Sequence, residues 1–237
     1  MEYLKVLKEI FIDGERYMYV LKGLKFSIGV TLLAAALGVL LGVIAALMRI
    51  SNFSPFKKSK NEKLRNFNPL QWLAIFYTDL IRGTPAVVQL MVLANIVFAG
   101  FRDMPVFLIA SLSFGINSGA YVCEIIRAGI EGLDKGQMEA AKALGMPYRI
   151  AMKEIIIPQA IKKILPALVS EFITLLKETS IVGFIGGVDL LRSANIITSQ
   201  TYRGVEPLIA VGIIYLIMTG LFTKLMRKVE KGMKVSD

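Results

Sequence analysis

A small set of polar and ionisable side chains interrupts the long apolar stretches of this chain, and these residues could do chemistry. Asn117, Tyr121 and Glu124 are spaced i, i+4 and i+7, so a helix would carry them on one face. Arg82 and Glu171 lie in other apolar stretches. Ionisable groups in such surroundings are costly and usually face an interior or a cavity. The expected chemistry is therefore the binding of a polar or charged group.

The same side chains could instead satisfy one another. Asp79 and Arg82 are three residues apart in the sequence, and pairs at this spacing interact along a helix. Glu124 and Arg127 have the same spacing. Asn117 could form a hydrogen bond to a neighbouring helix. Pairing and ligand binding both stay open for these residues, and pairing is favoured for Arg127.

Motifs for catalysis are missing from the sequence. There is no GxxxxGK[ST] phosphate-binding loop, so the chain carries no ATPase site of that kind. It has no histidine, and one cysteine, Cys123, makes neither a metal cluster nor a disulfide within the chain. A nucleophile elbow is also missing. We therefore expect a protein that is not an enzyme, holds no cofactor of its own and depends on another chain for energy.

Composition predicts an all-α, polytopic membrane protein. Of the 237 residues, 55% are hydrophobic, and the mean hydropathy of +0.60 is too apolar for a water-soluble domain. The net charge of +10 does not predict a nucleic-acid surface, because the basic residues lie between the apolar stretches. Gly38 and Gly42 form a GxxxG pair, which predicts close packing of the first span against another helix.

The chain divides into an amphipathic N-terminal segment, a transmembrane domain and a short tail. Five spans are predicted, with a break in the second at residues 79–85 and an outer loop at residues 188–206. The predicted boundaries are 1–22 for the amphipathic segment, 23–226 for the transmembrane domain and 227–237 for the tail. The five spans are predicted at residues 23–48, 70–98, 106–130, 164–185 and 207–226.

Basic residues predict the orientation in the membrane. They are concentrated at residues 49–65, at residues 127–163 and in the tail, and fewer lie in the segments assigned to the outside. Cytoplasmic loops of membrane proteins carry an excess of lysine and arginine. The N-terminus is therefore predicted to lie outside, and the tail and residues 134–158 in the cytoplasm.

Residues 134–158 are predicted to form two short helices around a tight turn. Asp134 and Gln137 have the spacing of a capping box, and Gly145 suits a left-handed turn. Pro158 is expected to end the second helix, because proline has no amide hydrogen. Small residues and an apolar Leu144 on the first helix are typical of a helix that docks into a partner's groove. The alternative is a helix on the bilayer surface, although such helices usually carry larger apolar side chains.

This segment resembles the EAA loop of the membrane subunit of ATP-binding-cassette importers. The resemblance lies in Glu139-Ala140-Ala141, Gly145 and Ile155-Ile156-Ile157-Pro158. It implies the architecture of a type I importer permease with a cytoplasmic coupling helix. The partner would be an ATPase dimer, which would bind the ATP and Mg²⁺. The residues implied for that contact are Gln137, Glu139, Ala140, Ala141, Leu144 and Gly145.

Further segments resemble the permeases for polar amino acids such as histidine, arginine, glutamine and cystine. They are Arg82-Gly83-Thr84-Pro85 followed by Val88-Gln89-Leu90, Asn117-Ser118-Gly119-Ala120-Tyr121 with Glu124-Ile125-Ile126-Arg127, and Lys177-Glu178-Thr179-Ser180. The resemblance implies a chain in the prokaryotic cytoplasmic membrane, in contact with lipid. It also implies a second permease chain, identical or paralogous, and an amino-acid-binding protein outside the cell.

An amino acid needs donors for its carboxylate and acceptors for its ammonium group. The residues expected to line its pocket are Arg82, Asn117, Ser118, Tyr121, Glu124 and Glu171. Neither glutamate is expected to have a basic partner at its own depth. Arg127 is one turn from Glu124, and Lys177 is nearly two turns from Glu171. A free carboxylate in a low dielectric favours an arriving cation, so a basic amino acid is favoured over glutamine or cystine.

The alternative function is an oligomeric channel or a secondary transporter that needs no ATPase. Secondary transporters commonly contain internal repeats, and no repeat is visible in this sequence. Five spans also do not divide into two equal halves. The predicted docking helix favours the importer subunit, because a channel has no need of it.

Overall fold

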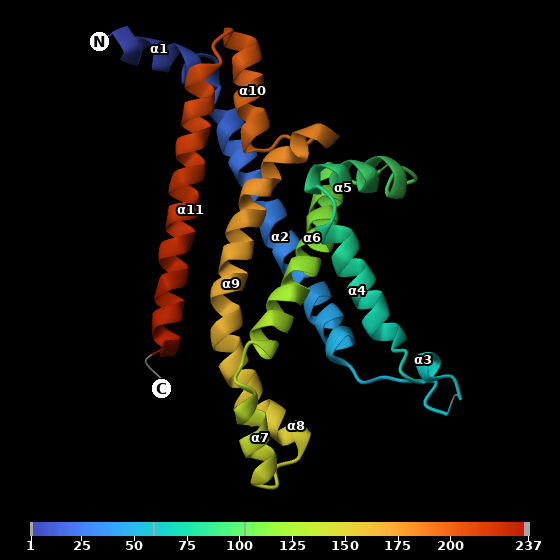
Figure 1. Ribbon diagram of the computed structural model, residues 1–237. Coiled ribbons are helices and arrows are strands. Elements are labelled where there is room, and N and C mark those ends of the chain that lie inside the picture. The colour runs from blue at the N-terminus through green and yellow to red at the C-terminus, as the bar shows by residue number, and fades with distance from the viewer. Residues whose placement is uncertain (1, 59, 102, 235–237) are drawn as a thin grey trace.

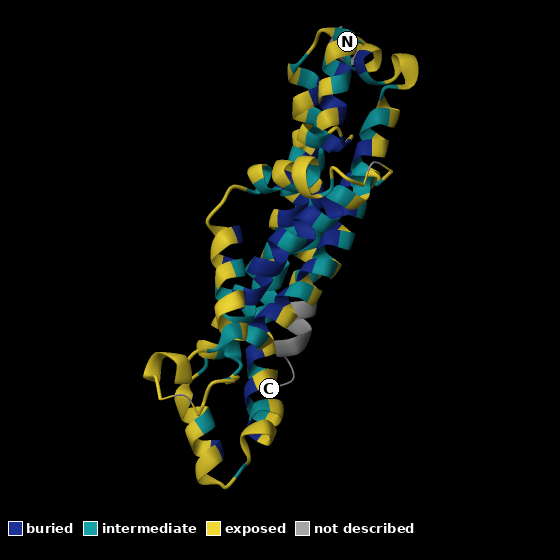
Figure 2. Ribbon diagram, turned by 90° about the vertical axis from the view of Figure 1, so that its right-hand side faces the viewer, coloured by how far each residue is buried: buried dark blue, intermediate teal, exposed yellow. Residues whose placement is uncertain are grey.

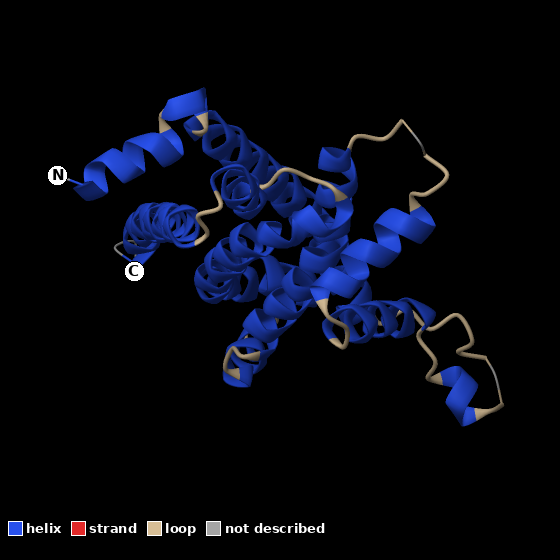
Figure 3. Cartoon of the chain, turned by 90° about the horizontal axis from the view of Figure 1, so that it is seen from above, coloured by secondary structure: helices blue, strands red, loops and turns tan. Residues whose placement is uncertain are grey.

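The computed structural model describes residues 2–58, 60–101 and 103–234, and their regular structure is helical throughout, with no strand among them (Figure 3). The all-α prediction is therefore confirmed. Helices α2, α4, α6, α9 and α11 run along the length of the molecule (Figure 1). Helix α1 and the end of α11 lie at opposite ends of that length, and α7 and α8 project at the same end as the end of α11.

The N-terminal part consists of α1 (Glu2–Phe11), a single turn at Asp13–Glu15 and the long α2 (Tyr17–Ile50). Gly14 in the turn has φ +75°, a left-handed conformation that glycine adopts without strain. Helix α2 begins six residues before the predicted span at residue 23, because nothing in residues 17–22 breaks a helix. The predicted amphipathic helix is therefore α1 alone.

The second predicted span is two helical pieces at a sharp angle. After a short α3 (Glu62–Arg65), α4 (Pro69–Arg82) and the pair α5 (Ala86–Val92) and η2 (Leu93–Val97) meet at 107°. The turn is stabilised by Gln89, whose amide donates to the carbonyl oxygens of Ile81, at 2.6 Å, and Thr84, at 2.9 Å. Backbone groups that Pro85 leaves without helical partners are thus satisfied by a side chain.

The segment after α6 (Val106–Glu131) differs from the prediction at one proline. Helix α7 (Lys135–Ala143) and α8 (Tyr148–Ala151) form the predicted pair, but the chain continues through a π-helical turn, η3 (Met152–Ile156), into α9 (Ile157–Glu178). The prediction that Pro158 ends a helix is wrong. The wide π turn places Pro158 in the first turn of α9, where the helix requires no amide donor.

The predicted outer loop at residues 188–206 contains a helix. After the short η4 (Thr179–Ile185), α10 (Leu190–Thr201) precedes α11 (Val205–Lys234), which includes the first residues of the predicted tail. Asp189 caps α10 by accepting hydrogen bonds from the backbone N–H groups of Leu191, at 2.7 Å, and Arg192, at 2.9 Å. An aspartate before a helix is an N-terminal signal that the loop assignment overlooked.

The number of spans is not confirmed as five. By length and composition, three helices in the described residues can cross a membrane. They are α2 with its preceding turn, α6 and α11. The bent pair of α4 with α5–η2 would be a fourth span if it counts as one. Helix α9 is not among them, because Lys162, Lys163 and Glu171 lie in its apolar stretch. It still runs alongside α2, α6 and α11 (Figure 1).

The core depends on a close contact between α2 and α6, whose buried residues run down the middle of the molecule (Figure 2). A Cβ added to Gly42 would lie 2.4 Å from Cγ1 of Val122. One added to Gly38 would lie 2.9 Å from the Ser118 side chain. The predicted GxxxG packing is therefore confirmed, with α6 as the partner helix.

We expect Gly42→Ala to lower the stability of the purified protein by about 1–3 kcal/mol, because the added methyl group overpacks the contact with Val122. Thermal unfolding in detergent would measure this change. Gly212→Ala on α11 is the control, since its Cβ would meet no atom within 4 Å. An equal effect of the two variants would contradict the assigned contact.

Candidate functional site

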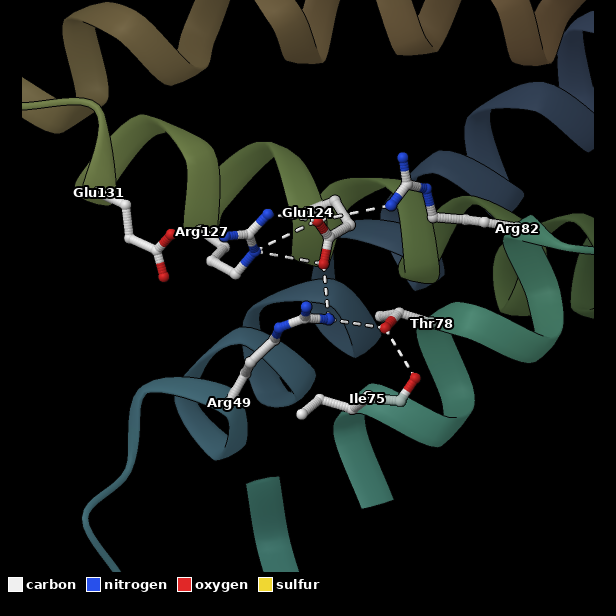
Figure 4. Close-up of polar contacts among 7 residues, drawn as sticks. All are labelled: Arg49, Ile75, Thr78, Arg82, Glu124, Arg127 and Glu131. Atoms are coloured by element: carbon white, nitrogen blue, oxygen red, sulfur yellow. Dashed lines mark hydrogen bonds and ion pairs between the residues drawn. The ribbon is translucent and has the colours of Figure 1, made fainter. Parts of the chain in front are cut away.

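Glu124 on α6 is the centre of a cluster of charged side chains (Figure 4). One carboxylate oxygen lies 2.6 Å from a guanidinium nitrogen of Arg49. The other lies 2.9 Å from Arg127 and 3.4 Å from Arg82. Arg127 also forms an ion pair with Glu131 one turn further along α6. Three guanidinium groups thus face two carboxylates, which leaves the cluster positive.

Three helices position this charged cluster. Arg49 lies in the last turn of α2 and Arg82 is the last residue of α4, while Glu124 and Arg127 lie on α6. Arg49 also donates to the hydroxyl of Thr78, at 2.7 Å, and that hydroxyl donates to the carbonyl of Ile75. The cluster therefore ties the ends of α2 and α4 to the C-terminal third of α6.

The expectation that Glu124 lacks a basic partner is wrong. Arg127 reaches it from one turn away, as the pairing alternative allowed, and Arg49 reaches it from another helix. Sequence reasoning treated Arg49 only as an orientation signal. The pairing alternative for Arg82 with Asp79 is also wrong, because the structure pairs Arg82 with Glu124. Arg49 and Arg82 reach Glu124 from other helices, and spacing along one helix does not report such contacts.

Asn117 and Ser118 are almost fully buried, and each has a partner in this chain. Asn117 donates to the side-chain oxygen of Gln89, at 2.8 Å, which links α6 to α5. Ser118 donates to the carboxylate of Glu171 on α9, at 2.9 Å. Gln89 was missed as a functional candidate, although its position in the resembling segment is a signal that could have found it.

Five of the six predicted pocket residues divide between two cavities, and Asn117 lines neither of them. Arg82, Tyr121 and Glu124 line a cavity of about 500 Å³, together with Lys163 of α9. The guanidinium of Arg82 lies 5.8 Å from the centre of the Tyr121 ring, within range of a cation–π interaction. Ser118 and Glu171 line a separate, largely apolar cavity of about 190 Å³. The prediction of one shared pocket is therefore wrong for this conformation.

The larger of these two cavities has the size and chemistry for a small zwitterion. Pockets for small molecules usually have volumes of about 300–1,000 Å³ and a few well-placed polar groups. The Arg82 side chain is 44% exposed, whereas that of Arg49 is 18% exposed, so Arg82 has more of its charge available. The ammonium of Lys163 is held nearby, 2.7 Å from the carbonyl oxygen of Gly132. The cavity therefore offers donors for a carboxylate.

A second candidate site is the segment around α7, which projects from one end of the molecule (Figure 1). Asp134 caps α7 by accepting from the N–H of Gly136, at 2.9 Å, and not through the predicted capping-box contact with Gln137. Gly145 has φ +77°, which confirms the predicted left-handed turn. The N–H of Met146 donates to the carbonyl of Ala141, which closes the end of the helix.

The predicted coupling residues differ in exposure. Leu144 is 82% exposed, an unusual environment for a leucine with no partner. Ala141 is 1% exposed and faces its own chain, so the prediction that it contacts a partner directly is wrong. The remaining predicted coupling residues are exposed, and they are Gln137, Glu139, Ala140 and Gly145.

Residues 38–235 match the family of binding-protein-dependent transport system inner membrane components. The chain belongs to this family. It is 42% identical over 224 residues to the arginine transport system permease protein ArtQ of Bacillus subtilis (strain 168), covering 92% of this chain and 94% of that protein. It is 38% identical over 223 residues to the putative glutamine transport system permease protein GlnP of Rickettsia bellii (strain RML369-C), covering 93% and 95%.

Solved structures agree with this family. The crystal structure of an amino acid ABC transporter with histidines superposes with a TM-score of 0.81 at 44% identity, covering 93% of this chain and 97% of that one. An inward-facing MetNI methionine ABC transporter gives a TM-score of 0.73 at 13% identity, covering 91% and 96%, which shows the shared fold. The predicted type I importer fold is confirmed, and as a permease component the chain is not an enzyme.

We expect Glu124→Gln to lower the stability of the protein by about 2–4 kcal/mol, because three guanidinium groups lose the carboxylate between them. Glu131→Gln is the matched control. It removes a carboxylate that is 58% exposed and whose ion-pair partner within the described residues is Arg127, so its effect should stay below about 1 kcal/mol. Thermal unfolding of both variants would measure the difference, and equal shifts would show that Glu124 does not organise the cluster.

Proposed function

We propose that this chain is the pore-forming permease subunit of an ATP-driven importer of polar amino acids, with arginine as the first candidate substrate. One observation carries the proposal: relatives described as arginine and glutamine permeases match over 92% and 93% of the chain. Arginine is the first candidate because the arginine permease is the more similar of these two relatives.

The substrate path runs between α4, α6 and α9 in this proposal. The cavity lined by Arg82 and Tyr121 supplies the donors for the carboxylate that every amino acid carries. Glu124 is neutralised by guanidinium groups and so contributes little attraction for a cationic side chain. Glu171 forms no ion pair within the described residues, and its partner there is the hydroxyl of Ser118. We therefore assign the preference for a cation to Glu171, through a conformation in which the two cavities join.

Coupling to an ATPase dimer is assigned to α7 and the turn after it. Leu144 provides an apolar anchor, and Gln137, Glu139, Ala140 and Gly145 form the surrounding surface. Ala141 supports this surface from beneath, because it packs against its own chain. A small, exposed helix of this kind suits the groove of a partner, whereas a membrane-surface helix would place larger apolar side chains in the lipid.

The orientation follows from the coupling assignment. ATP is available in the cytoplasm, so the end that carries α7 lies on that side, together with the end of α11. The N-terminus then lies outside, as the distribution of basic residues predicts. The remaining partners of the proposed transporter are a second permease chain and a binding protein that delivers the amino acid from outside.

Uptake of arginine and glutamine into vesicles that contain the complete transporter tests the proposal. Wild-type vesicles should take up arginine when ATP is present. Glu171→Gln should raise the apparent Km for arginine about tenfold and leave that for glutamine nearly unchanged, because a cation loses its counter-charge. Glu62→Gln, in the short exposed helix α3 before α4, is the control. ATP-dependent uptake of neither amino acid would contradict the function, and equal effects on both would contradict the role of Glu171.

A further inference from the structure

A long apolar groove lies on another face of α6 from the Arg82 cavity. It has a volume of about 680 Å³ and lies between residues 39–52 of α2 and its end, residues 122–130 of α6 and residues 148–168 of α8 and α9. Val122, Ile126 and Ile130 form its floor, because residues four apart share one face of a helix. None of the described side chains that line it is acidic. The assignments above do not use this groove.

The groove is polar at one end only. Where it reaches the end of α2 and the start of α8, it is lined by Ser51, Asn52, Tyr148, Arg149 and Lys153. Along the rest of its length the lining is aliphatic. Tyrosine and basic side chains of this kind gather where a membrane protein meets the headgroup layer. The polar end is therefore placed at the membrane surface, near the projecting α7 and α8 (Figure 1).

The length of the groove matches one leaflet of a bilayer. From Val39 to Ile50, eleven helical steps of about 1.5 Å give about 17 Å along α2, and Ser51 and Asn52 extend the groove beyond the helix. One leaflet, which is half of a hydrocarbon core of about 30 Å plus its headgroup layer, has about the same thickness. A groove of this length would follow one lipid molecule from its headgroup to the end of its chain.

The charges at the polar end are available to a ligand. Arg149 forms no ion pair with any acidic side chain that the structure describes. Lys153 lies 3.3 Å from Glu154, but both side chains are largely exposed, at 81% and 58%, so this pair is weak. Two cationic groups thus stand at the mouth of an apolar groove with no acid inside it. Basic sites between membrane helices recognise the headgroups of anionic lipids.

We propose that this groove binds an anionic phospholipid, with one acyl chain between α2, α6 and α9 and the phosphate at Arg149 and Lys153. The charge at one end favours a lipid over a helix from a second copy of the chain. The site lies beside α8, which follows the proposed coupling turn, so an occupied groove would hold α8 against α2. This proposal requires only that the chain lies in a membrane.

Native mass spectrometry of the full-length protein, purified with its partners from vesicles of phosphatidylglycerol and phosphatidylcholine, tests the charge at the site. Wild type should retain phosphatidylglycerol in preference to phosphatidylcholine. The double variant Arg149→Gln, Lys153→Gln should lose about tenfold or more of that preference, because each basic residue near an anionic headgroup contributes about fivefold in affinity. The control is the double variant Lys57→Gln, Lys58→Gln, which removes two exposed charges from the loop between α2 and α3.

A second pair of variants tests the groove itself. Val43→Trp fills it from α2, whereas Leu40→Trp places the same ring on α2 outside the groove. Only Val43→Trp should reduce retained lipid. Three results would each overturn the proposal. The first is equal retention of the two lipids by wild type, and the second is an equal loss of lipid in variants and controls. The third is a Val43→Trp variant that retains lipid but changes the number of chains per particle.

Discussion

The close contact between α2 and α6 is the constraint on which the rest of this structure depends. Gly38 and Gly42 let the two helices approach so closely that a single added carbon would collide with Ser118 or Val122. Helices in lipid gain little from the hydrophobic effect, so this packing has to come from van der Waals contact between small residues. The same approach brings Arg49 at the end of α2 to Glu124 on α6. A wider spacing would separate that pair and leave the guanidinium of Arg49 without its carboxylate.

The charged cluster and the two cavities follow from this framework. Glu124 joins the ends of α2 and α4 to α6, and the cluster keeps an excess of positive charge beside the cavity of Arg82 and Tyr121. On a different face of α6, Val122 forms part of an apolar groove with basic residues at its mouth. One helix therefore separates a polar cavity from an apolar groove, and α7 projects from the same end of the molecule as the end of α11.

Much of the fold was predictable from local signals. The helices, the break before Pro85, the GxxxG contact and the left-handed Gly145 all depend on residues close in sequence. The π turn before Pro158 was not predictable in this way, because a proline signals a helix end unless the preceding turn widens. The ion-pair partners of the charged residues were harder still to predict. Arg49 lies 75 positions from Glu124, and only packing between helices brings them together.

Substrate-stimulated ATP hydrolysis by the reconstituted transporter tests the central claim, that this permease is coupled to an ATPase through the turn after α7. Gly145→Val should abolish most of the stimulation while the chain still inserts into the membrane, because a branched residue is strained at φ +77°. Gly145→Asn should retain it, since asparagine tolerates this conformation. Full stimulation in the valine variant would contradict the account.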